Sequence, residues 1–167
     1  LLEDPLVGIS TGFYKLDDIT LGFQEQDLIV IAGRPSMGKT SLALNIAENV
    51  AREDAKNQKV LIFSLEMSSE QVVRRLISSC AKIDMQRLTK GEIKNDEWQP
   101  IEDALTFLAK DNILIDDTAA LSPSDVRSIS RRVKREHKDL CMIIVDYIGL
   151  MHVPGRRDNR VAEISEI

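Results

Sequence analysis

The sequence predicts an α/β fold in which a mostly parallel β-sheet carries helices on both faces and is incomplete at its C-terminal end. Three observations lead to this class. Short apolar runs alternate with longer helix-like stretches along most of the chain. The runs are nearly all apolar, as in strands that are covered on both faces. A glycine-containing loop joins the first apolar run to the first helical stretch.

The elements follow one another in a regular order. Serine residues mark two helix starts: Ser122 precedes Pro123 as a cap before a first-turn proline, and Ser68 with Gln71 resembles a capping box. The expected strands span residues 28–32, 60–65, 113–115 and 142–145. The expected helices span residues 40–54, 69–83, 95–109 and 123–137.

Bulk composition indicates one globular domain. The chain has 167 residues and is 43% hydrophobic, which suffices to bury one core. The net charge of −5 argues against a generally basic nucleic-acid binder, so any such contact requires a local patch. No apolar run is long enough to span a membrane, and no signal peptide opens the chain. We interpret Cys80 and Cys141 as buried small apolar groups of a reducing compartment.

We expect the chain to be a piece of a longer protein, because it starts without Met and stops inside a helix-like stretch. Residues 1–167 are interpreted as one domain fragment. It comprises an opening segment (1–26), a nucleotide-binding core (27–150), and a terminal stretch (151–167) with a basic loop and the start of a helix.

The strongest motif is a phosphate-binding loop of the pattern G-x-x-x-x-G-K-[ST]. Gly33 and Gly38 let backbone N–H groups approach phosphate oxygens, and the following helix adds its positive end. Lys39 can reach the β and γ phosphates, and the Thr40 hydroxyl can ligand a magnesium ion. The predicted nucleotide-binding residues are Gly33, Arg34, Pro35, Ser36, Met37, Gly38, Lys39, Thr40 and Ser41.

Carboxylates end three of the predicted strands, at the edge where parallel sheets bind ligands. Asp146 fits the acid that holds a nucleotide's magnesium, although strands also end in Asp as a turn residue. Glu66 could polarise the water that attacks the γ-phosphate, or could serve as a charge at a helix N-terminus. We interpret Asp116 and Asp117 as turn residues.

Several motifs, in order along nearly the whole chain, resemble the bacterial replicative DNA helicases of the DnaB family. The family commonly has Leu-Gln where this chain has Ile148-Gly149. The resembling segments are Gly8-Ile9-Ser10-Thr11-Gly12-Phe13, Arg34-Pro35-Ser36-Met37-Gly38-Lys39-Thr40, Ser64-Leu65-Glu66-Met67-Ser68, Ile144-Val145-Asp146-Tyr147 and Val153-Pro154-Gly155-Arg156-Arg157-Asp158-Asn159-Arg160.

The resemblance implies a RecA-like P-loop NTPase that uses ATP and Mg²⁺ in a homohexameric ring around single-stranded DNA and unwinds duplex DNA. It implies a primase and a helicase loader as partners, and a cytoplasmic, nucleoid-associated location. Lys39 and Thr40 would bind phosphates and magnesium, Glu66 would be the catalytic base, and Asp146 the acid associated with the metal. A helix arginine near the γ-phosphate would be Arg75, with Arg74 as the alternative. The family's γ-phosphate sensor and arginine finger would lie beyond the last residue.

The expected DNA contact is the loop at residues 153–160, where Arg156, Arg157, Asn159 and Arg160 could hold phosphates without choosing a sequence. A mobile solvated loop is the alternative. The helix at 123–137 carries a second basic cluster, which we interpret as a solvated or subunit-facing surface. Its members are Arg127, Arg131, Arg132, Lys134, Arg135 and Lys138.

Two other function classes share parts of this pattern. A different RecA-like ATPase, either a filament-forming recombinase or a regulatory ring, would have the same loop and the same acid at a strand end. A GTP-dependent switch would match the D-x-x-G of residues 146–149, but the chain has no N-K-x-D or T-K-x-D for guanine selection. The arginine-containing phosphate loop and the basic loop favour the helicase.

Overall fold

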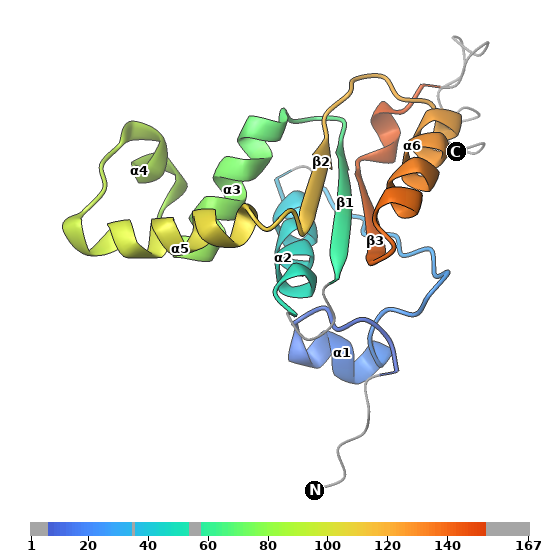
Figure 1. Cartoon of the computed structure of the whole chain (residues 1–167), viewed down its shortest axis with the longest axis horizontal. Helices are drawn as coiled ribbons and strands as arrows, with labels where there is room; N and C mark the ends of the chain where they lie inside the picture. The colour runs from blue at the N-terminus through green and yellow to red at the C-terminus, as the bar shows by residue number, and fades with distance from the viewer. Residues whose placement is uncertain (1–6, 35, 54–57, 153–167) are drawn as a thin grey trace, which may run out of the picture.

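A three-stranded parallel sheet forms the centre of the molecule (Figure 1). The computed structural model describes residues 7–34, 36–53 and 58–152. The strands are β1 (Lys59–Ser64), β2 (Ile113–Asp116) and β3 (Leu140–Asp146), in the order β2-β1-β3. The α/β class and the parallel sheet are thereby confirmed.

The central strand β1 is buried on both faces, because its side chains alternate between two cores. Val60 and Ile62 pack with helices α2 (Lys39–Ala51) and α3 (Ser69–Ala81). Leu61 and Phe63 pack with the apolar side of α6 (Pro123–Glu136). Figure 1 shows α2 and α6 on opposite sides of the sheet.

The predicted helix starts at Ser68 and Ser122 are both confirmed as capping boxes. The Ser68 hydroxyl accepts from the Gln71 N–H, and the Gln71 side chain accepts in return from the Ser68 N–H. The Ser122 hydroxyl accepts from the Asp125 N–H, while the Asp125 carboxylate accepts from the Ser122 N–H. The Asp125 carboxylate accepts from both the Ser122 hydroxyl and the Ser122 N–H, and these two bonds hold the pKa of Asp125 below its ordinary value. Each helix therefore begins within one residue of its predicted start.

The opening segment forms a short helix, α1 (Tyr14–Thr20), that the sequence did not predict. The buried Asp17 carboxylate accepts hydrogen bonds from the Thr11 N–H and hydroxyl and from the Ser10 hydroxyl. The Asn49 amide of α2 then donates to the Thr11 carbonyl at 2.9 Å. A Cβ on Gly12 would lie 2.2 Å from that amide, so glycine is required where the segment meets α2.

Helices α3, α4 (Met85–Lys90) and α5 (Trp98–Leu108) extend to one side of the sheet (Figure 1). The predicted helix at 95–109 is a 3-10 turn, Asn95–Glu97, followed by α5, and α4 was not predicted. Arg87 donates two 2.7 Å hydrogen bonds to Glu97 and lowers the pKa of that carboxyl to about 2. This bidentate pair joins α4 to the start of α5.

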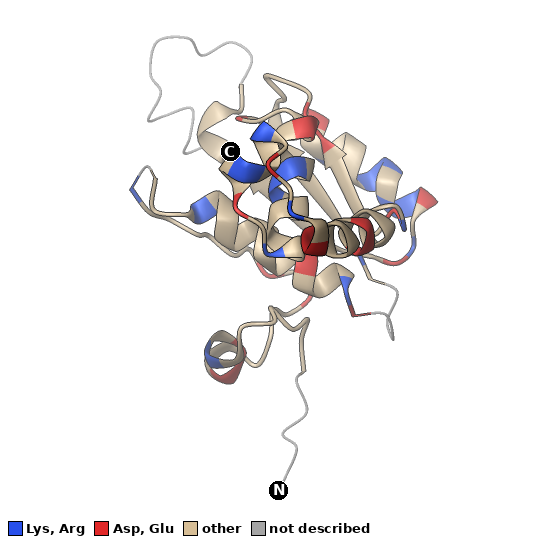
Figure 2. Ribbon diagram, turned by 90° about the vertical axis from the view of Figure 1, so that its left-hand side faces the viewer, with Lys and Arg blue, Asp and Glu red and all other residues tan. Residues whose placement is uncertain are grey.

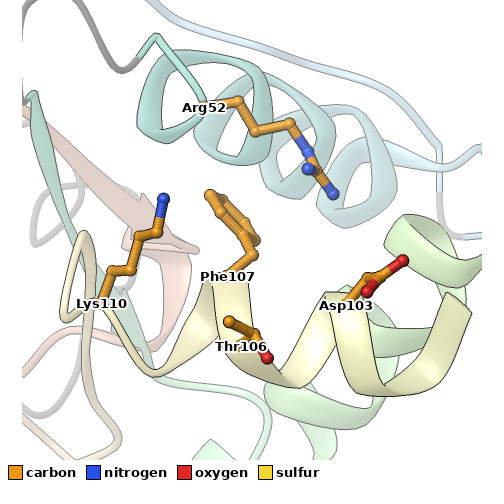
Figure 3. Close-up of a pocket in the computed structure, with 5 residues that line it drawn as sticks. All are labelled: Arg52, Asp103, Thr106, Phe107 and Lys110. Atoms are coloured by element: carbon orange, nitrogen blue, oxygen red, sulfur yellow. The ribbon is translucent and has the colours of Figure 1, made fainter. Parts of the chain in front are cut away.

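The far end of α2 rests on α5, as Figure 3 shows. The Arg52 guanidinium carbon lies 4.3 Å from the centroid of the Phe107 ring, within the range of a cation–π contact. Arg52 also bonds to the buried Glu48, which accepts from the Ser79 hydroxyl of α3. A hollow of about 360 Å³ remains beside this contact, lined by Arg52, Asp103, Thr106, Phe107 and Lys110.

The predicted strand at 28–32 is wrong: residues 28–32 form no strand. Leu28 is 91% exposed and Val30 is 72% exposed, and no strand of the described residues pairs with them. A strand requires hydrogen bonds to a neighbouring strand, and an apolar run alone does not provide them.

The core predicts a large effect of truncating Phe63, which has no exposed surface. We expect Phe63→Ala to lower the free energy of unfolding by about 3–5 kcal/mol, because it removes buried area and leaves a cavity. Leu105→Ala, at a site that is 48% exposed, should change it by less than about 0.5 kcal/mol. Urea denaturation of both variants measures the difference; equal effects would contradict the packing described for β1.

Candidate nucleotide-binding site

The phosphate loop bends through two residues in left-handed conformations. Ser36 has φ 64° and Gly38 has φ 86°, and Gly38 caps the N-terminus of α2. Glycine adopts such a conformation at little cost, so the second glycine of the motif is required by the backbone. The loop is open to solvent at Gly33, Arg34 and Met37, while Pro35 lies outside the described residues. The N-terminus of α2 therefore faces an accessible loop, which suits an anion.

A hydrogen bond joins the loop to β3. The Thr40 hydroxyl donates to the Asp146 carboxylate at 2.7 Å, between residues 106 positions apart. This contact brings the predicted magnesium-binding pair together. The two oxygens are of the kind that Mg²⁺ prefers, and Mg²⁺ commonly takes one or two protein oxygens besides phosphates and water. The donor set therefore fits the predicted metal.

Glu66 lies at the same edge of the sheet as Asp146. Ser64, the last residue of β1, is paired with Asp146, and the Leu65 N–H donates to the Asp146 carbonyl at 2.8 Å. The Ser64 hydroxyl donates to the Met67 carbonyl at 2.7 Å and closes the turn that carries Glu66. The Glu66 side chain is exposed. An exposed carboxylate at the same sheet edge as the acid predicted to hold the metal has the placement expected of a base for an attacking water.

Two arginines of α3 have different surroundings. Arg74 forms an ion pair with Glu70 one helical turn away, with 2.5 Å between nitrogen and oxygen. Arg75 lines a hollow of about 350 Å³ together with Ser41, Leu44 and Asn45 of α2. Arg75 is thus the arginine that faces the helix of the phosphate loop, and its role near the γ-phosphate stays a prediction.

Tyr147, to which the sequence assigned no role, also lies at the site. The ring of Tyr147, next to Asp146, lies beneath the Lys39 ammonium, with 5.6 Å between the nitrogen and the ring centroid. An exposed aromatic residue directly after the strand-end acid was the signal that could have indicated it.

The two adjacent acids at the end of β2 form structural hydrogen bonds. Asp116 accepts from the Thr118 N–H, which is the predicted turn. Asp117 instead accepts from the Ser69 N–H at 2.7 Å, and this bond holds the pKa of Asp117 below its ordinary value. Asp117 therefore ties the end of β2 to the start of α3.

Of the two basic segments, only the helix is described by the structure. The predicted DNA loop with Arg156, Arg157, Asn159 and Arg160 lies outside the described residues. On α6, the Val126, Ile129 and Val133 side chains pack on the sheet, and Arg127, Arg131, Arg132 and Arg135 are exposed. Lys134 donates to the carbonyls of Lys138 and Leu140. Figure 2 shows charges of both signs spread over the helices.

The two cysteines are only half-buried, whereas the sequence predicted buried side chains. Cys80 and Cys141 are half-buried free thiols, and burial raises the pKa of each to about 11. Across 7–34, 36–53 and 58–152, no helix is both long and apolar enough to cross a membrane.

A parallel α/β sheet, a phosphate loop at a helix N-terminus and two acids at adjacent strand ends define a P-loop nucleotide-binding domain. Comparison with known proteins narrows this class. Residues 8–167 match the family described as the DnaB-like helicase C terminal domain. The chain belongs to this family.

Relatives and solved structures agree with this membership. The chain is 47% identical over 164 residues to the replicative DNA helicase DnaB of Haemophilus influenzae, and 45% identical over 166 residues to that of Geobacillus stearothermophilus. These alignments cover 97% and 99% of the chain but only 35% and 36% of the relatives. The chain thus spans about a third of the length of these helicases.

Two solved structures have nearly the same fold. One, described as an ATPase domain, superposes with a TM-score of 0.89 at 29% identity, covering 99% of this chain and 58% of the other. A DnaB-like replicative helicase, described with its interactions with primase, gives a TM-score of 0.88 at 29% identity, covering 98% of this chain and 39% of the other. The RecA-like fold class expected from the resemblance is confirmed at the level of these ATPase domains.

The loop geometry predicts a direct test of the phosphate contact. We expect Lys39→Ala to weaken binding of ATP with magnesium at least about tenfold, because a lost charge-assisted bond is worth about 1.5–3 kcal/mol. Lys15→Ala, at an exposed position of α1, is the matched control and should bind normally. Equilibrium titration with a fluorescent ATP analogue measures both; unchanged affinity of Lys39→Ala would remove Lys39 from the site.

Proposed function

We propose that the chain is the ATP-binding and ATP-hydrolysing core of a replicative DNA helicase, which unwinds duplex DNA as a homohexameric ring travelling on single-stranded DNA. The observation that carries the proposal is the contact between Thr40 and Asp146, since it joins the phosphate loop to the acid expected to hold magnesium. Membership of the DnaB-like family supports DNA as the substrate.

The nucleotide would be held by the loop from Gly33 to Ser41, with Pro35 included as part of the motif. Backbone N–H groups at the start of α2 and the Lys39 ammonium supply the positive charge for the phosphates. Thr40 and Asp146 are the residues that would hold Mg²⁺, which when bound neutralises charge on the phosphates.

The hydrolytic step would use Glu66 as the base. Its carboxylate can take a proton from water at the edge of the sheet where Asp146 also lies. Arg75 would stabilise charge that develops on the γ-phosphate, because it faces the α2 side of α3 while Arg74 is engaged by Glu70.

The proposed partners are supported by the likeness to a solved structure. A structure neighbour is described with its interactions with primase, and we propose primase as a partner of this protein as well. A helicase loader, a cytoplasmic location and association with the nucleoid accord with the same function. We further propose the division of the chain into an opening segment (1–26), a nucleotide core (27–150) and a DNA-contacting stretch (151–167).

Glu66→Gln separates nucleotide binding from hydrolysis. We expect the intact variant to bind ATP and to keep the particle mass of a closed hexamer, while hydrolysis falls about 10²–10⁴-fold and unwinding of a tailed duplex stops, because the amide cannot take the proton. Glu102→Gln, on the exposed side of α5, is the control and should hydrolyse ATP normally. Hydrolysis at the wild-type rate would show that another acid is the base, and an extended filament in place of a hexamer would favour a recombinase.

The DNA contact is tested by replacing Arg156, Arg157 and Arg160 with Ala in the intact protein. We expect weaker binding of single-stranded DNA of every sequence, and a salt dependence that is flatter by about 0.7 per lost phosphate contact. Basal ATP hydrolysis should remain, while DNA-stimulated hydrolysis should fall.

The matched control removes the same charge from α6, as Arg127→Ala, Arg131→Ala and Arg132→Ala together. Fluorescence anisotropy with a labelled oligonucleotide at several salt concentrations compares the two triple variants with wild type. If only the α6 variant loses affinity, the DNA site lies on that helix and the proposal for residues 153–160 is wrong.

A further inference from the structure

The Tyr147 ring lies between the lysine of the phosphate loop and a glycine two residues along the chain. We propose that Tyr147 is a positioning residue for Lys39, which holds the ammonium group while the site is empty and gives it up to the phosphates of ATP, and that Gly149 provides the space for the ring. This inference rests on the proposed binding of ATP at the loop and concerns how that same site is prepared for it.

Gly149 is required by the position of the ring. A Cβ at residue 149 would lie 2.6 Å from Cε2 and 3.0 Å from Cδ2 of Tyr147, closer than such atoms can approach. The backbone between them is a tight turn, with the Leu150 N–H donating to the Tyr147 carbonyl at 3.0 Å. Because this turn fixes the two residues relative to each other, a side chain at position 149 must push the ring aside.

Lys39 has no carboxylate partner among the described residues. It is the first residue of α2, where the positive end of the helix dipole disfavours a cation. No carboxylate of the described residues forms an ion pair with its ammonium group, and the Asp146 carboxylate already accepts from Thr40. The negative face of an aromatic ring attracts an ammonium group within about 6 Å of its centroid, and here that distance is 5.6 Å.

The contact lies near the outer limit of this range, so a small movement of Lys39 toward a phosphate breaks it. The Lys39 stem has room to move along the loop, since it is only partly buried and even a Cβ added to Gly33 would meet its Cγ no closer than 3.4 Å. Binding of ATP therefore exchanges the ring for a phosphate oxygen. The ring and the phosphate oxygen thus compete for the Lys39 ammonium. Removing the ring should end this competition and leave the contact between Lys39 and the phosphate in place.

The test measures nucleotide affinity in the intact protein with four variants. Tyr147→Leu removes the ring, Tyr147→Phe keeps it without the hydroxyl, and Gly149→Ala displaces it. We expect Tyr147→Leu and Gly149→Ala to bind ATP about 2- to 5-fold more tightly than wild type, as expected for loss of one exposed cation–π contact. Tyr147→Phe should match wild type.

The fourth variant combines Tyr147→Leu with Gly149→Ala and should bind no more tightly than Tyr147→Leu, because both changes act through the same ring. Independent, additive effects would overturn the proposal. So would Tyr147→Leu binding no more tightly than wild type, or Tyr147→Phe behaving like Tyr147→Leu.

A second measurement reports on the contact without nucleotide. In protein carrying ¹³C-labelled lysine, the Lys39 methylene signals, assigned by their loss in Lys39→Arg, should be displaced by the ring in wild type and Tyr147→Phe. They should move to an ordinary position in Tyr147→Leu and Gly149→Ala. Undisplaced wild-type signals would overturn the proposal. Displaced signals in a protein that binds no ATP would instead refute the proposed nucleotide site and leave the Lys39–Tyr147 contact intact.

Discussion

The hydrogen bond between Thr40 and Asp146 is the constraint on which the site depends. It fixes the N-terminus of α2 against the carboxyl end of β3, and the parallel register of β1 with β3 then places Glu66 at the same edge. Both Glu66 and Asp146 are distant from the phosphate loop in the sequence. Both are brought there because strands of one direction, buried on both faces, must end together.

Much of the fold could be predicted, because apolar runs and helix-capping residues are local signals. The structure closely follows the continuous apolar run of β1 and the capping residues of α3 and α6. Residues 28–32 show the limit of this reasoning: their apolar side chains suit a buried strand, but pairing depends on a neighbouring strand that an apolar run does not specify. Helices α1 and α4 are short and depend on tertiary contacts such as Thr11–Asp17 and Arg87–Glu97.

The residues of the candidate site also fall into two groups: those that the sequence could indicate and those that only the structure reveals. Residue type and position suffice for a prediction where a residue belongs to a motif or ends a strand. This is the case for Lys39, Thr40, Glu66 and Asp146. Tyr147 and Asp117 act through contacts with residues distant in the sequence, Lys39 and Ser69, and no spacing rule connects those pairs. Arg75 was preferred to Arg74 through the family resemblance alone, and the different surroundings of these two adjacent helix residues are visible only in the structure.

Helix α2 is held at three places along its length. Its first turn is bound to Asp146, Asn49 donates to the opening segment at Thr11, and Arg52 at its end stacks on Phe107. Thirteen residues of α-helix span about 20 Å, and a hydrogen-bonded helix of that length resists bending. A tilt imposed at the phosphate-loop end of the helix would therefore be carried to the opening segment and to α5 as displacement of whole elements.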